Sequence, residues 1–495
     1  MYDRLKKTAG QSLIYSLGNV ATKLIGIVLL PLYTNYLSVS DFGKLAMIEV
    51  SLLLLLQVLI LGQNQSVIRF QVQADSPEKS AAIVFTLMLF VVSVGGLSSA
   101  VIFSMAVPIS TWLGQPARFV IVVKLASLVL FFRMLTTMAL SVLRANEKSA
   151  FFAVVNILKF MTLLVLNLIL VGRYRMGLQG IFYGYLASEI LLLLTVTPYM
   201  LGQCRLSLNF RKLKNAVLFG IPMVFASLAM TALLFCDRYL LKILVDFKEV
   251  GLYDFGNRIA GVLNVLFIRS FQMSLLPIAY KIYGQKGDRR YYSKIQTYFV
   301  YLLAWVGLAL SVYGPEWIAL LAQKPDYAAA VPVVTLIALA HVANGARQSV
   351  SLGLLLKNHT RILAISTLGS AVVNVLLNLL LIPRFQMIGA AWATVLSFFL
   401  LYLWTWFAAH RVFPIPYEHS KLLKILGVSA CIYFISGAVH FQSALLVIAV
   451  KAVLLMLFPL LLYLWGFYEP VELERIRRLP GAVRLRLASW RRSKR

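Results

Sequence analysis

The sequence is poor in the residues that a water-exposed surface requires. Only 13% of its 495 residues are charged, and Asp and Glu together number 18, whereas 60% of the residues are hydrophobic. A soluble domain cannot hide that much apolar side chain, because its outside must face water. The composition therefore excludes a soluble enzyme or a soluble binding domain, and it predicts an integral membrane protein.

Cysteine is scarce as well. The three cysteines, Cys204, Cys236 and Cys431, have no spacing typical of a metal or redox site, and two of them fall inside apolar segments. Such a set does not predict a disulfide framework. We therefore expect no bound metal and no cofactor, and no group of residues in the sequence indicates a catalytic site.

The shortage of acidic residues leaves a formal net charge of +29. The basic residues are spread along the connections between apolar stretches, and no nucleic-acid-binding motif accompanies them, so we reject a nucleic-acid partner. With the N-terminus in the cytoplasm, roughly 30 of them fall on the cytoplasmic side and about seven on the other, as the positive-inside rule requires. This asymmetry predicts that both termini are cytoplasmic.

Apolar stretches long enough to cross a bilayer, about 20 residues each, recur along the whole chain. We predict membrane spans at residues 10–35, 44–67, 81–107, 119–142, 150–171, 178–201, 216–245, 251–281, 295–321, 328–356, 362–382, 388–409, 422–441 and 443–467. Apart from the tail, the longest connections have about a dozen residues, which leaves no room for a soluble catalytic domain. We therefore do not expect an enzyme.

Two segments of the chain recur at nearly the same spacing. Residues 167–176 match residues 378–387 at an offset of 211, with five identities in ten positions. Residues 40–43 resemble residues 248–251 at an offset of 208. Each copy contains six predicted spans, an even number, so both copies begin on the same side of the membrane and are parallel repeats.

We therefore predict an all-α integral membrane fold of about fourteen transmembrane helices, with two parallel six-helix repeats that form two lobes and two appended helices. The predicted divisions are an N-terminal lobe at 1–204, a C-terminal lobe at 205–414, helices 13 and 14 at 415–467, and a basic cytoplasmic tail at 468–495. Two lobes with a cleft between them are typical of a transporter. This architecture works as a monomer, which is the oligomeric state we expect.

Some charged residues fall inside the predicted spans, where each costs roughly 2.5–3.5 kcal/mol on insertion scales. Such side chains line a water-filled cavity or pair with one another. The basic residues that we expect to form a cationic, substrate-binding cavity are Lys23, Arg133, Lys159, Arg258 and Arg269. The candidates for ion coupling are Glu49, Glu189 and Asp237. Structural pairing and hydrogen bonding are the alternative for both sets.

Spacing along the helices adds detail to these assignments. Asp254 and Arg258 are four residues apart, one helical turn, which predicts an ion pair. Arg258 and Arg269 are eleven residues apart, about three turns, which predicts that they project from one face. The basic residues nearer to span ends are instead expected to reach the lipid headgroups; they are Lys124, Lys242 and Arg347.

A series of loose motifs carries a resemblance to a known family. They are Ser16-Leu-Gly-Asn19, Leu37-Ser-Val-Ser-Asp-Phe-Gly43, Leu61-Gly62 followed by Arg69-Phe70, Asp237-Arg238-Tyr239, Glu249-Val-Gly-Leu-Tyr253, the run from Asn374 to Pro383, and Gly389-Ala-Ala-Trp-Ala-Thr394. In order and spacing, over nearly the whole chain, they resemble the polysaccharide transporter (Wzx-type flippase) family. Its superfamily, MOP, also holds the MATE exporters and the lipid II flippase.

The resemblance implies a flippase of the bacterial inner membrane that moves a polyprenyl-diphosphate-linked oligosaccharide, an O-antigen or exopolysaccharide repeat unit, to the outer leaflet by alternating access. It also implies contact with membrane lipid and with a polysaccharide polymerase and other assembly proteins as partners. An anionic diphosphate agrees with a cationic cavity, because Arg binds phosphate bidentately and Lys attracts it as a point charge. A lipid II-type flippase and a MATE-type cation-coupled exporter stay open as alternatives, and no site residue is carried over from the family.

Overall fold

A computed structural model describes residues 26–114, 116–439, 441–470 and 472–474. These residues form helices joined by short turns, and no β-strand occurs among them. Within the same residues, 12 helices are long and apolar enough to cross a membrane. The predicted all-α membrane fold is therefore confirmed, and the chain is a multi-pass membrane protein.

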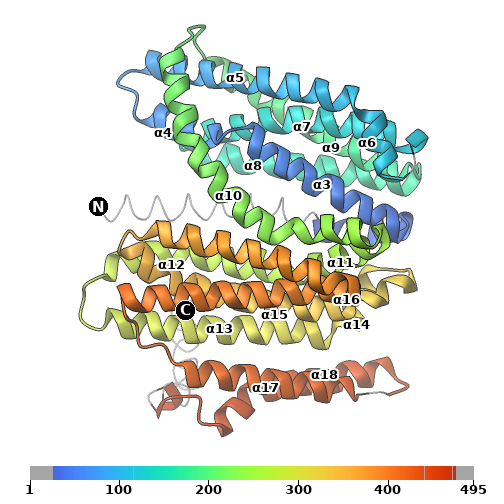
Figure 1. The fold of residues 1–495 in the computed structure, drawn as a ribbon, viewed down its shortest axis with the longest axis vertical. Helices are drawn as coiled ribbons and strands as arrows, with labels where there is room; N and C mark the ends of the chain where they lie inside the picture. The colour runs from blue at the N-terminus through green and yellow to red at the C-terminus, as the bar shows by residue number, and fades with distance from the viewer. Residues whose placement is uncertain (1–25, 115, 440, 471, 475–495) are drawn as a thin grey trace, which may run out of the picture.

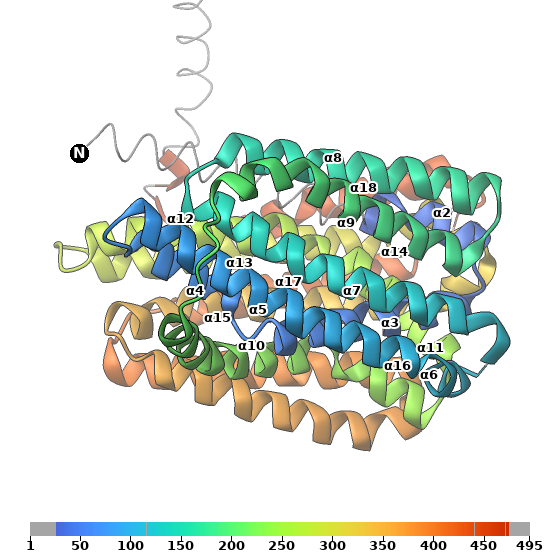
Figure 2. The ribbon, with the colours of Figure 1, turned by 90° about the horizontal axis from the view of Figure 1, so that it is seen from above.

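The helices fall into two groups and an appended pair, which Figure 1 shows as successive layers. The first helix group contains α2 (Leu30–Tyr36), α3 (Val39–Leu59), α4 (Gln63–Val72), α5 (Pro77–Ser104), α6 (Ala106–Trp112), α7 (Pro116–Ala145), α8 (Ser149–Asn167), the π-helix η1 (Leu168–Arg173) and α9 (Gly177–Gly202). The second helix group contains α10 (Phe210–Leu244), α11 (Phe247–Ala260), the π-helix η2 (Leu263–Ile268), α12 (Arg269–Ile282), α13 (Asp288–Val312), α14 (Gly314–Leu321), the 3₁₀ helix η3 (Pro325–Ala330), α15 (Val331–Leu356) and α16 (Thr360–Val412). The appended pair is α17 (His419–Gly437) and α18 (Ala444–Leu464). Seen from above, most of the long helices run roughly parallel (Figure 2).

The longest element, α16, is two helices. A straight helix of 53 residues would be about 80 Å long, whereas the hydrocarbon core of a bilayer is about 30 Å thick. The backbone leaves the helical region at Gln386, where φ is 50°, so the chain bends there between two membrane-length helices. One of the 12 candidates thus contains two spans, which gives 13 within the described residues. The first predicted span lies largely outside them, so the count of fourteen stays a prediction.

The backbone carries the internal duplication that the sequence indicates. Arg175 and Gln386, 211 residues apart, have φ values of 52° and 50°. Glu147 and Asn358, also 211 residues apart, have φ values of 54° and 60°. Left-handed conformations are uncommon for residues other than glycine. Two pairs of them at the offset of the sequence match show that the turns of the two repeats have the same local structure.

The two helix groups meet at two glycines, Gly43 and Gly251, which occupy equivalent positions in the two repeats. A Cβ added at Gly43 of α3 would lie 2.0 Å from the carbonyl oxygen of Phe247, and one at Gly251 of α11 would lie 2.2 Å from that of Val39. Gly43 and Gly251 are 208 positions apart, and so are Val39 and Phe247. The contact is therefore reciprocal, as across a two-fold axis. The weak sequence match between residues 40–43 and 248–251 therefore marks the closest approach of α3 and α11.

Helix α10 joins the two groups at the other end of α3. It packs against α4 at one end and against α16 further along, and Figure 1 shows it crossing between the layers. Near its start, a Cβ at Gly220 would lie 2.0 Å from the carbonyl oxygen of Leu61. The backbones of α10 and of the α3–α4 turn are therefore in direct contact.

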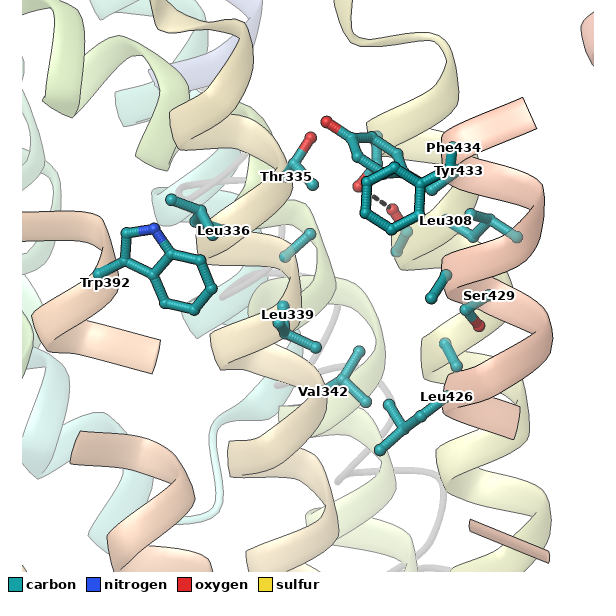
Figure 3. Close-up of a pocket in the computed structure, with 15 residues that line it drawn as sticks. Leu308, Thr335, Leu336, Leu339, Val342, Trp392, Leu426, Ser429, Tyr433 and Phe434 are labelled. Carbon is teal, nitrogen blue, oxygen red and sulfur yellow. Dashed lines mark hydrogen bonds between the residues drawn. The ribbon is translucent and has the colours of Figure 1, made fainter. Parts of the chain in front are cut away.

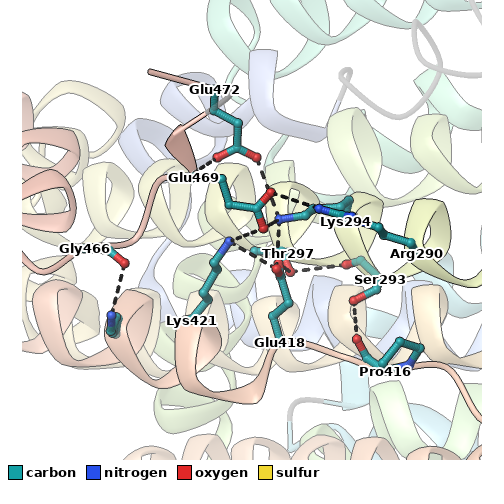
Figure 4. Close-up of polar contacts among 11 residues, drawn as sticks. Arg290, Ser293, Lys294, Thr297, Pro416, Glu418, Lys421, Gly466, Glu469 and Glu472 are labelled. Atoms are coloured by element: carbon teal, nitrogen blue, oxygen red, sulfur yellow. Dashed lines mark hydrogen bonds and ion pairs between the residues drawn. The ribbon is translucent and has the colours of Figure 1, made fainter. Parts of the chain in front are cut away.

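An ion cluster ties the appended pair to the second helix group (Figure 4). Lys294 of α13 binds Glu418, which precedes α17, at 2.8 Å, and it also binds Glu469, which follows α18. Lys421 of α17 reaches the same two carboxylates, at 3.1 and 3.4 Å. Residues before α17 and after α18 both bind one lysine of α13, so the start of α17 and the end of α18 are fixed to this helix.

Away from this cluster, the appended pair leaves an apolar pocket beside the second helix group (Figure 3). The pocket has a volume of about 290 Å³ and lies between α13, α15 and α17, with Trp392 of α16 at one side. Tyr433 and Phe434 of α17 face Leu336 and Leu339 of α15 across it. Its lining is almost wholly hydrocarbon, so it suits an apolar occupant.

The glycine contact predicts a strict size limit at Gly43. In Gly43→Ala the new methyl group meets the backbone of Phe247, which cannot rotate away, so we expect a loss of about 1–3 kcal/mol of stability. The thermal midpoint of the detergent-solubilised chain measures it. The control is Gly202→Ala, where an added Cβ meets nothing within 4 Å; equal midpoints for the two variants would refute the contact.

The ion cluster predicts acid sensitivity. Burial raises the pKa of Glu418, but hydrogen bonds from Lys294 and Thr297 and the charge of Lys421 outweigh burial and hold this pKa below the usual 4.5. A carboxylate with a lowered native pKa stabilises the fold above its unfolded pKa, and this stabilisation is lost as the pH falls through the native value. We expect the thermal midpoint to drop between about pH 5 and pH 3, and to drop less in Glu418→Gln. The same acid response in both chains would contradict the assignment.

Candidate functional site

Two cations share one carboxylate inside the first helix group. Glu189 of α9 is fully buried; its Oε1 lies 3.0 Å from Nε of Arg133 on α7 and 2.7 Å from Nζ of Lys159 on α8. Its other oxygen accepts a hydrogen bond of 2.8 Å from Thr136. Two positive charges on one negative charge leave a net charge of +1 at this place. We call Arg133 and Lys159 the cation pair.

The cation pair keeps donors free for a further partner. The side chains of Arg133 and Lys159 are 24% and 22% exposed, although Glu189 beneath them is not exposed at all. Within the described residues, Arg133 donates to Glu189 through Nε, and its two terminal nitrogens donate no hydrogen bond. A guanidinium with both terminal nitrogens available can bind a phosphate or carboxylate bidentately.

Tyr185 connects the cation pair to the second helix group. It lies one turn before Glu189 on α9, so both side chains share a face of that helix. Its ring is 5.6 Å from the guanidinium of Arg133, and its hydroxyl donates a hydrogen bond to Glu49 of α3. The other carboxylate oxygen of Glu49 accepts a charged hydrogen bond of 2.6 Å from Arg258 of α11. Glu49 and Arg258 therefore form an ion pair between the two groups.

Arg258 is shared between carboxylates of both groups. Besides Glu49, it binds Asp254 one turn earlier on α11, with 2.7 Å between Nε and Oδ2. The predicted pair of Asp254 and Arg258 is therefore confirmed. The guanidinium also lies 5.1 Å from the ring of Phe42 on α3. Through its contacts with Glu49 and Phe42, Arg258 therefore holds α11 against the first helix group.

A further buried arginine, Arg238, lies between two carboxylates of the second helix group. Arg238 of α10 is fully buried and reaches Asp254 at 3.0 Å, with Asp237 at 3.7 Å. The Oδ2 atom of Asp237 accepts hydrogen bonds from Tyr253 and, at 3.3 Å, from Thr394. Its Oδ1 atom is buried and has no partner among the described residues. An unpartnered carboxylate oxygen in a dry interior is a candidate position for a proton or a small cation.

These contacts make one continuous chain from α8 to α16, which we call the charge network. Its charged members are Arg133, Lys159, Glu189, Glu49, Arg258, Asp254, Arg238 and Asp237. Four cations and four carboxylates balance, so the charge network as a whole carries no net charge. The distribution is uneven, with the surplus positive charge at the cation pair.

The predicted cavity residues have different surroundings. Arg133, Lys159 and Arg258 each pair with a carboxylate, as the alternative of structural pairing anticipates. Arg269, at the start of α12, is exposed and has no acidic partner among the described residues. The π-helix η2 lies between Arg258 and Arg269 and changes the rotation per residue, which removes the basis for placing them on one face. Lys23 lies outside the described residues.

Arg347 shows that one expectation from span ends is wrong. It is only 8% exposed, and its Nε donates to Asn344 at 3.2 Å, so it does not reach the headgroups. Helix α15 continues to Leu356, about 13 Å further along the axis, which places Arg347 well inside the span. Lys124 and Lys242 both lie over aromatic rings.

Three neutral polar residues of the charge network have no feature in the sequence that assigns them to the site. Tyr185, Thr136 and Thr394 sit in apolar stretches and carry no charge that would single them out. The one available signal was spacing, since Tyr185 precedes Glu189 by four residues and so lies on the same helix face. Thr394 contacts Asp237 across 157 positions, which no local pattern shows.

Comparison with known proteins gives a family and a fold. Residues 9–283, more than half of the chain, match the family described as polysaccharide biosynthesis protein. A search of curated proteins finds no match. A solved structure of the lipid II flippase MurJ, in an inward closed conformation, aligns with a TM-score of 0.70 and 14% identity over 92% of this chain and 100% of that chain.

Other similar structures are transporters. A MATE protein in its straight conformation aligns with a TM-score of 0.60 and 14% identity, over 82% of this chain and 96% of that chain. A MOP superfamily transporter from Pyrococcus furiosus, described as having a binding pocket of reverse polarity, aligns with a TM-score of 0.57 and 12% identity, over 85% and 96%. At these identities the likeness shows a shared fold alone.

The buried carboxylate predicts a large stability effect at Glu189. In Glu189→Gln two adjacent cations lose their counter-charge, and we expect a loss of about 3–5 kcal/mol. The matched control is Glu78→Gln, which breaks a pair with Arg205 whose side chains are 75% and 58% exposed, for a loss below about 1 kcal/mol. Thermal unfolding in detergent compares them, and similar midpoints would show that Glu189 does not neutralise the pair.

Proposed function

Since this chain belongs to the polysaccharide biosynthesis protein family, we propose that it is a flippase for a polyprenyl-diphosphate-linked oligosaccharide, an O-antigen or exopolysaccharide repeat unit. The protein lies in the bacterial inner membrane with both termini in the cytoplasm, and it moves the lipid from the cytoplasmic to the outer leaflet. Two lobes, residues 1–204 and 205–414, alternate the access of a site between them. We propose a transporter that works as a monomer beside a polysaccharide polymerase, and no enzyme.

The observation that carries this proposal is the cation pair. It places a surplus positive charge, with unused hydrogen-bond donors, in the middle of membrane-spanning helices. A diphosphate matches such a site in charge and geometry, because arginine binds phosphate oxygens in pairs and lysine adds a second cation. We propose that Arg133 and Lys159 bind the diphosphate, with Lys23 and Arg269 as further cations along its path.

The carboxylates of the charge network divide into two roles in this proposal. Glu189 anchors the cation pair, because it is fully buried between both cations. Asp237 has an unpartnered oxygen and Glu49 joins the two helix groups, so these two are the ion-coupling residues. Binding of a proton or cation at either one changes the charge balance on which the closed arrangement of helices depends.

The apolar pocket beside α17 supports a lipid substrate. It offers almost no polar group to a sugar or a diphosphate, and its walls are leucine, alanine and aromatic side chains (Figure 3). A hydrocarbon chain gains from such a surface without losing hydrogen bonds to water. We propose that part of the polyprenyl chain lies along this side of the second helix group.

Lipid II is the second candidate substrate. The fold likeness to the lipid II flippase is the observation that favours it. A MATE-type exporter of cationic compounds is less favoured, because the exposed donors of the cation pair repel a cation.

A transport assay tests the proposal. Purified chain in vesicles should move a polyprenyl-diphosphate-linked oligosaccharide between leaflets, measured by a membrane-impermeant lectin. Arg133→Gln and Lys159→Gln should each lower the rate about tenfold or more, because each removes a charge-assisted hydrogen bond. Glu189 keeps one cation in either variant, so both should fold.

The control is Lys79→Gln, whose side chain is 66% exposed and pairs with the surface carboxylate of Asp75. Vesicles with lipid II in place of the oligosaccharide lipid compare the two substrates. In cells, deletion of the gene should leave the lipid-linked glycan on the inner leaflet. Normal surface polysaccharide in the deletion strain, or unchanged rates in both cation-pair variants, would defeat the assignment.

A further inference from the structure

The ion pair between Glu49 and Arg258 lies beside the glycine contact that joins α3 and α11. Glu49 is six residues beyond Gly43 and Arg258 seven beyond Gly251, so the pair sits about 9–10 Å deeper along both helices. The glycines are packed against backbone, whereas the side chains of Glu49 and Arg258 are 24% and 15% exposed. The ion pair therefore lies at the inner end of the α3–α11 contact, where the side chains are partly exposed.

Several other contacts close the same end of the molecule. The rings of Phe42, Phe255 and Tyr327 pack together, with centroids 4.7–6.3 Å apart, and combine α3 with α11 and η3. Thr34 of α2 donates 2.8 Å to the carbonyl oxygen of Leu321 in α14. All of these are neutral or aromatic. Cations contribute too: Lys324 donates to the carbonyl oxygen of Leu37, and Lys44 lies over the ring of Phe247. Among the described residues at this end, however, Glu49 and Arg258 form the one ion pair between a cation and a carboxylate of the two groups, and an anionic ligand can compete for that cation.

The two partners of this ion pair are unequal once they separate. Arg258 keeps Asp254 on its own helix, at 2.7 Å. Among the described residues, Glu49 then keeps one hydrogen bond, from the hydroxyl of Tyr185, with Tyr33 nearby. If the helix groups part at this end, Glu49 therefore loses the one cation that it contacts among the described residues. An anion that binds Arg258, together with movement of the surplus positive charge of the cation pair toward Glu49, compensates for this loss.

The cation pair is close enough for such an exchange. Arg133 lies against the ring of Tyr185, and Glu49 accepts a hydrogen bond from the hydroxyl of the same residue. One tyrosine side chain thus separates the proposed diphosphate site from the carboxylate that holds Arg258. A diphosphate has two linked phosphate groups and can therefore contact more than one cation. Arginine donates to phosphate with the same bidentate geometry as to carboxylate, so a phosphate can replace the carboxylate of Glu49 on Arg258.

We propose that the Glu49–Arg258 ion pair is a latch between the two helix groups, and that a diphosphate bound at Arg133 opens it by replacing the Glu49 carboxylate on Arg258. The inference rests on the proposed function for its ligand. It assigns to Arg258 a second contact, with substrate, that exists only after the latch opens. Tyr185 is a positioning residue, because it fixes Glu49 next to the cation pair. Access of the site to the other side of the membrane then depends on the negative charge of the substrate's diphosphate.

Distances between spin labels test the latch. Labels on cysteines introduced at Tyr174 and Lys248, after replacement of the native cysteines, report the separation of the groups at this end. Both residues are exposed, and Tyr174 belongs to the turn that reaches Leu37 through Gly177. The full chain is measured in lipid nanodiscs with and without a short prenyl diphosphate, and with the uncharged prenyl alcohol.

We expect one short distance without ligand, a longer distance with prenyl diphosphate, and no change with the alcohol. Glu49→Gln should raise the ratio of long to short distances about tenfold or more without any ligand. The matched control is Glu249→Gln, which removes a carboxylate at the same end; in the described part of the chain this carboxylate accepts one hydrogen bond, from the backbone of Met387 within the second group. Its distances should match the wild type.

The outcomes separate the two proposals. If prenyl diphosphate fails to bind the wild-type chain, the proposed function and the release of the latch by substrate both fail. If it binds and the distances stay short, the latch alone is overturned. Short distances in Glu49→Gln, or equal changes in Glu49→Gln and Glu249→Gln, would also overturn it.

Discussion

The structure depends on the cost of charge in hydrocarbon. A lone charged side chain at the centre of a bilayer is strongly disfavoured, so each one has to be neutralised by a partner or by water. In the charge network four cations meet four carboxylates, and most of the contacts are between helices that are distant in sequence. The charges therefore link helices that are distant in sequence, and within the charge network the surplus positive charge lies at Arg133 and Lys159, where donors remain accessible.

The duplication gives the molecule a symmetric backbone and an asymmetric set of charges. Gly43 and Gly251 are equivalent positions, and each packs on the helix that carries the other. At the same offset of 208, the position equivalent to Glu49 is Asn257, and the position equivalent to Arg258 is Val50. The close approach of α3 and α11 is therefore a property of the repeat, whereas the ion pair across it occurs once. A contact that occurs once can respond to a ligand without disturbing the packing that the repeats share.

Much of the fold could be predicted because it follows from local composition. The apolar stretches mark the spans, and the described helices lie where these stretches are. The match between residues 167–176 and 378–387 predicted parallel repeats, and the left-handed Arg175 and Gln386 show the same turn in both copies. The pair of Asp254 and Arg258 was predictable because one helical turn separates them. The face shared by Arg258 and Arg269 was not, because the arithmetic assumes a regular helix and η2 is a π-helix.

What the sequence by itself determined is the class of protein: a multi-pass helical bundle with a duplicated core and costly charges inside it. These follow from hydropathy and repetition, which are properties of neighbouring residues. Only the tertiary structure decided which charges meet. Glu49 and Arg258 are 209 positions apart and Arg133 and Glu189 are 56 apart, and Tyr185 joins the two sets without carrying a charge. Partners across such distances are chosen by helix packing, and the same packing keeps Arg347 away from the headgroups that its sequence position suggested.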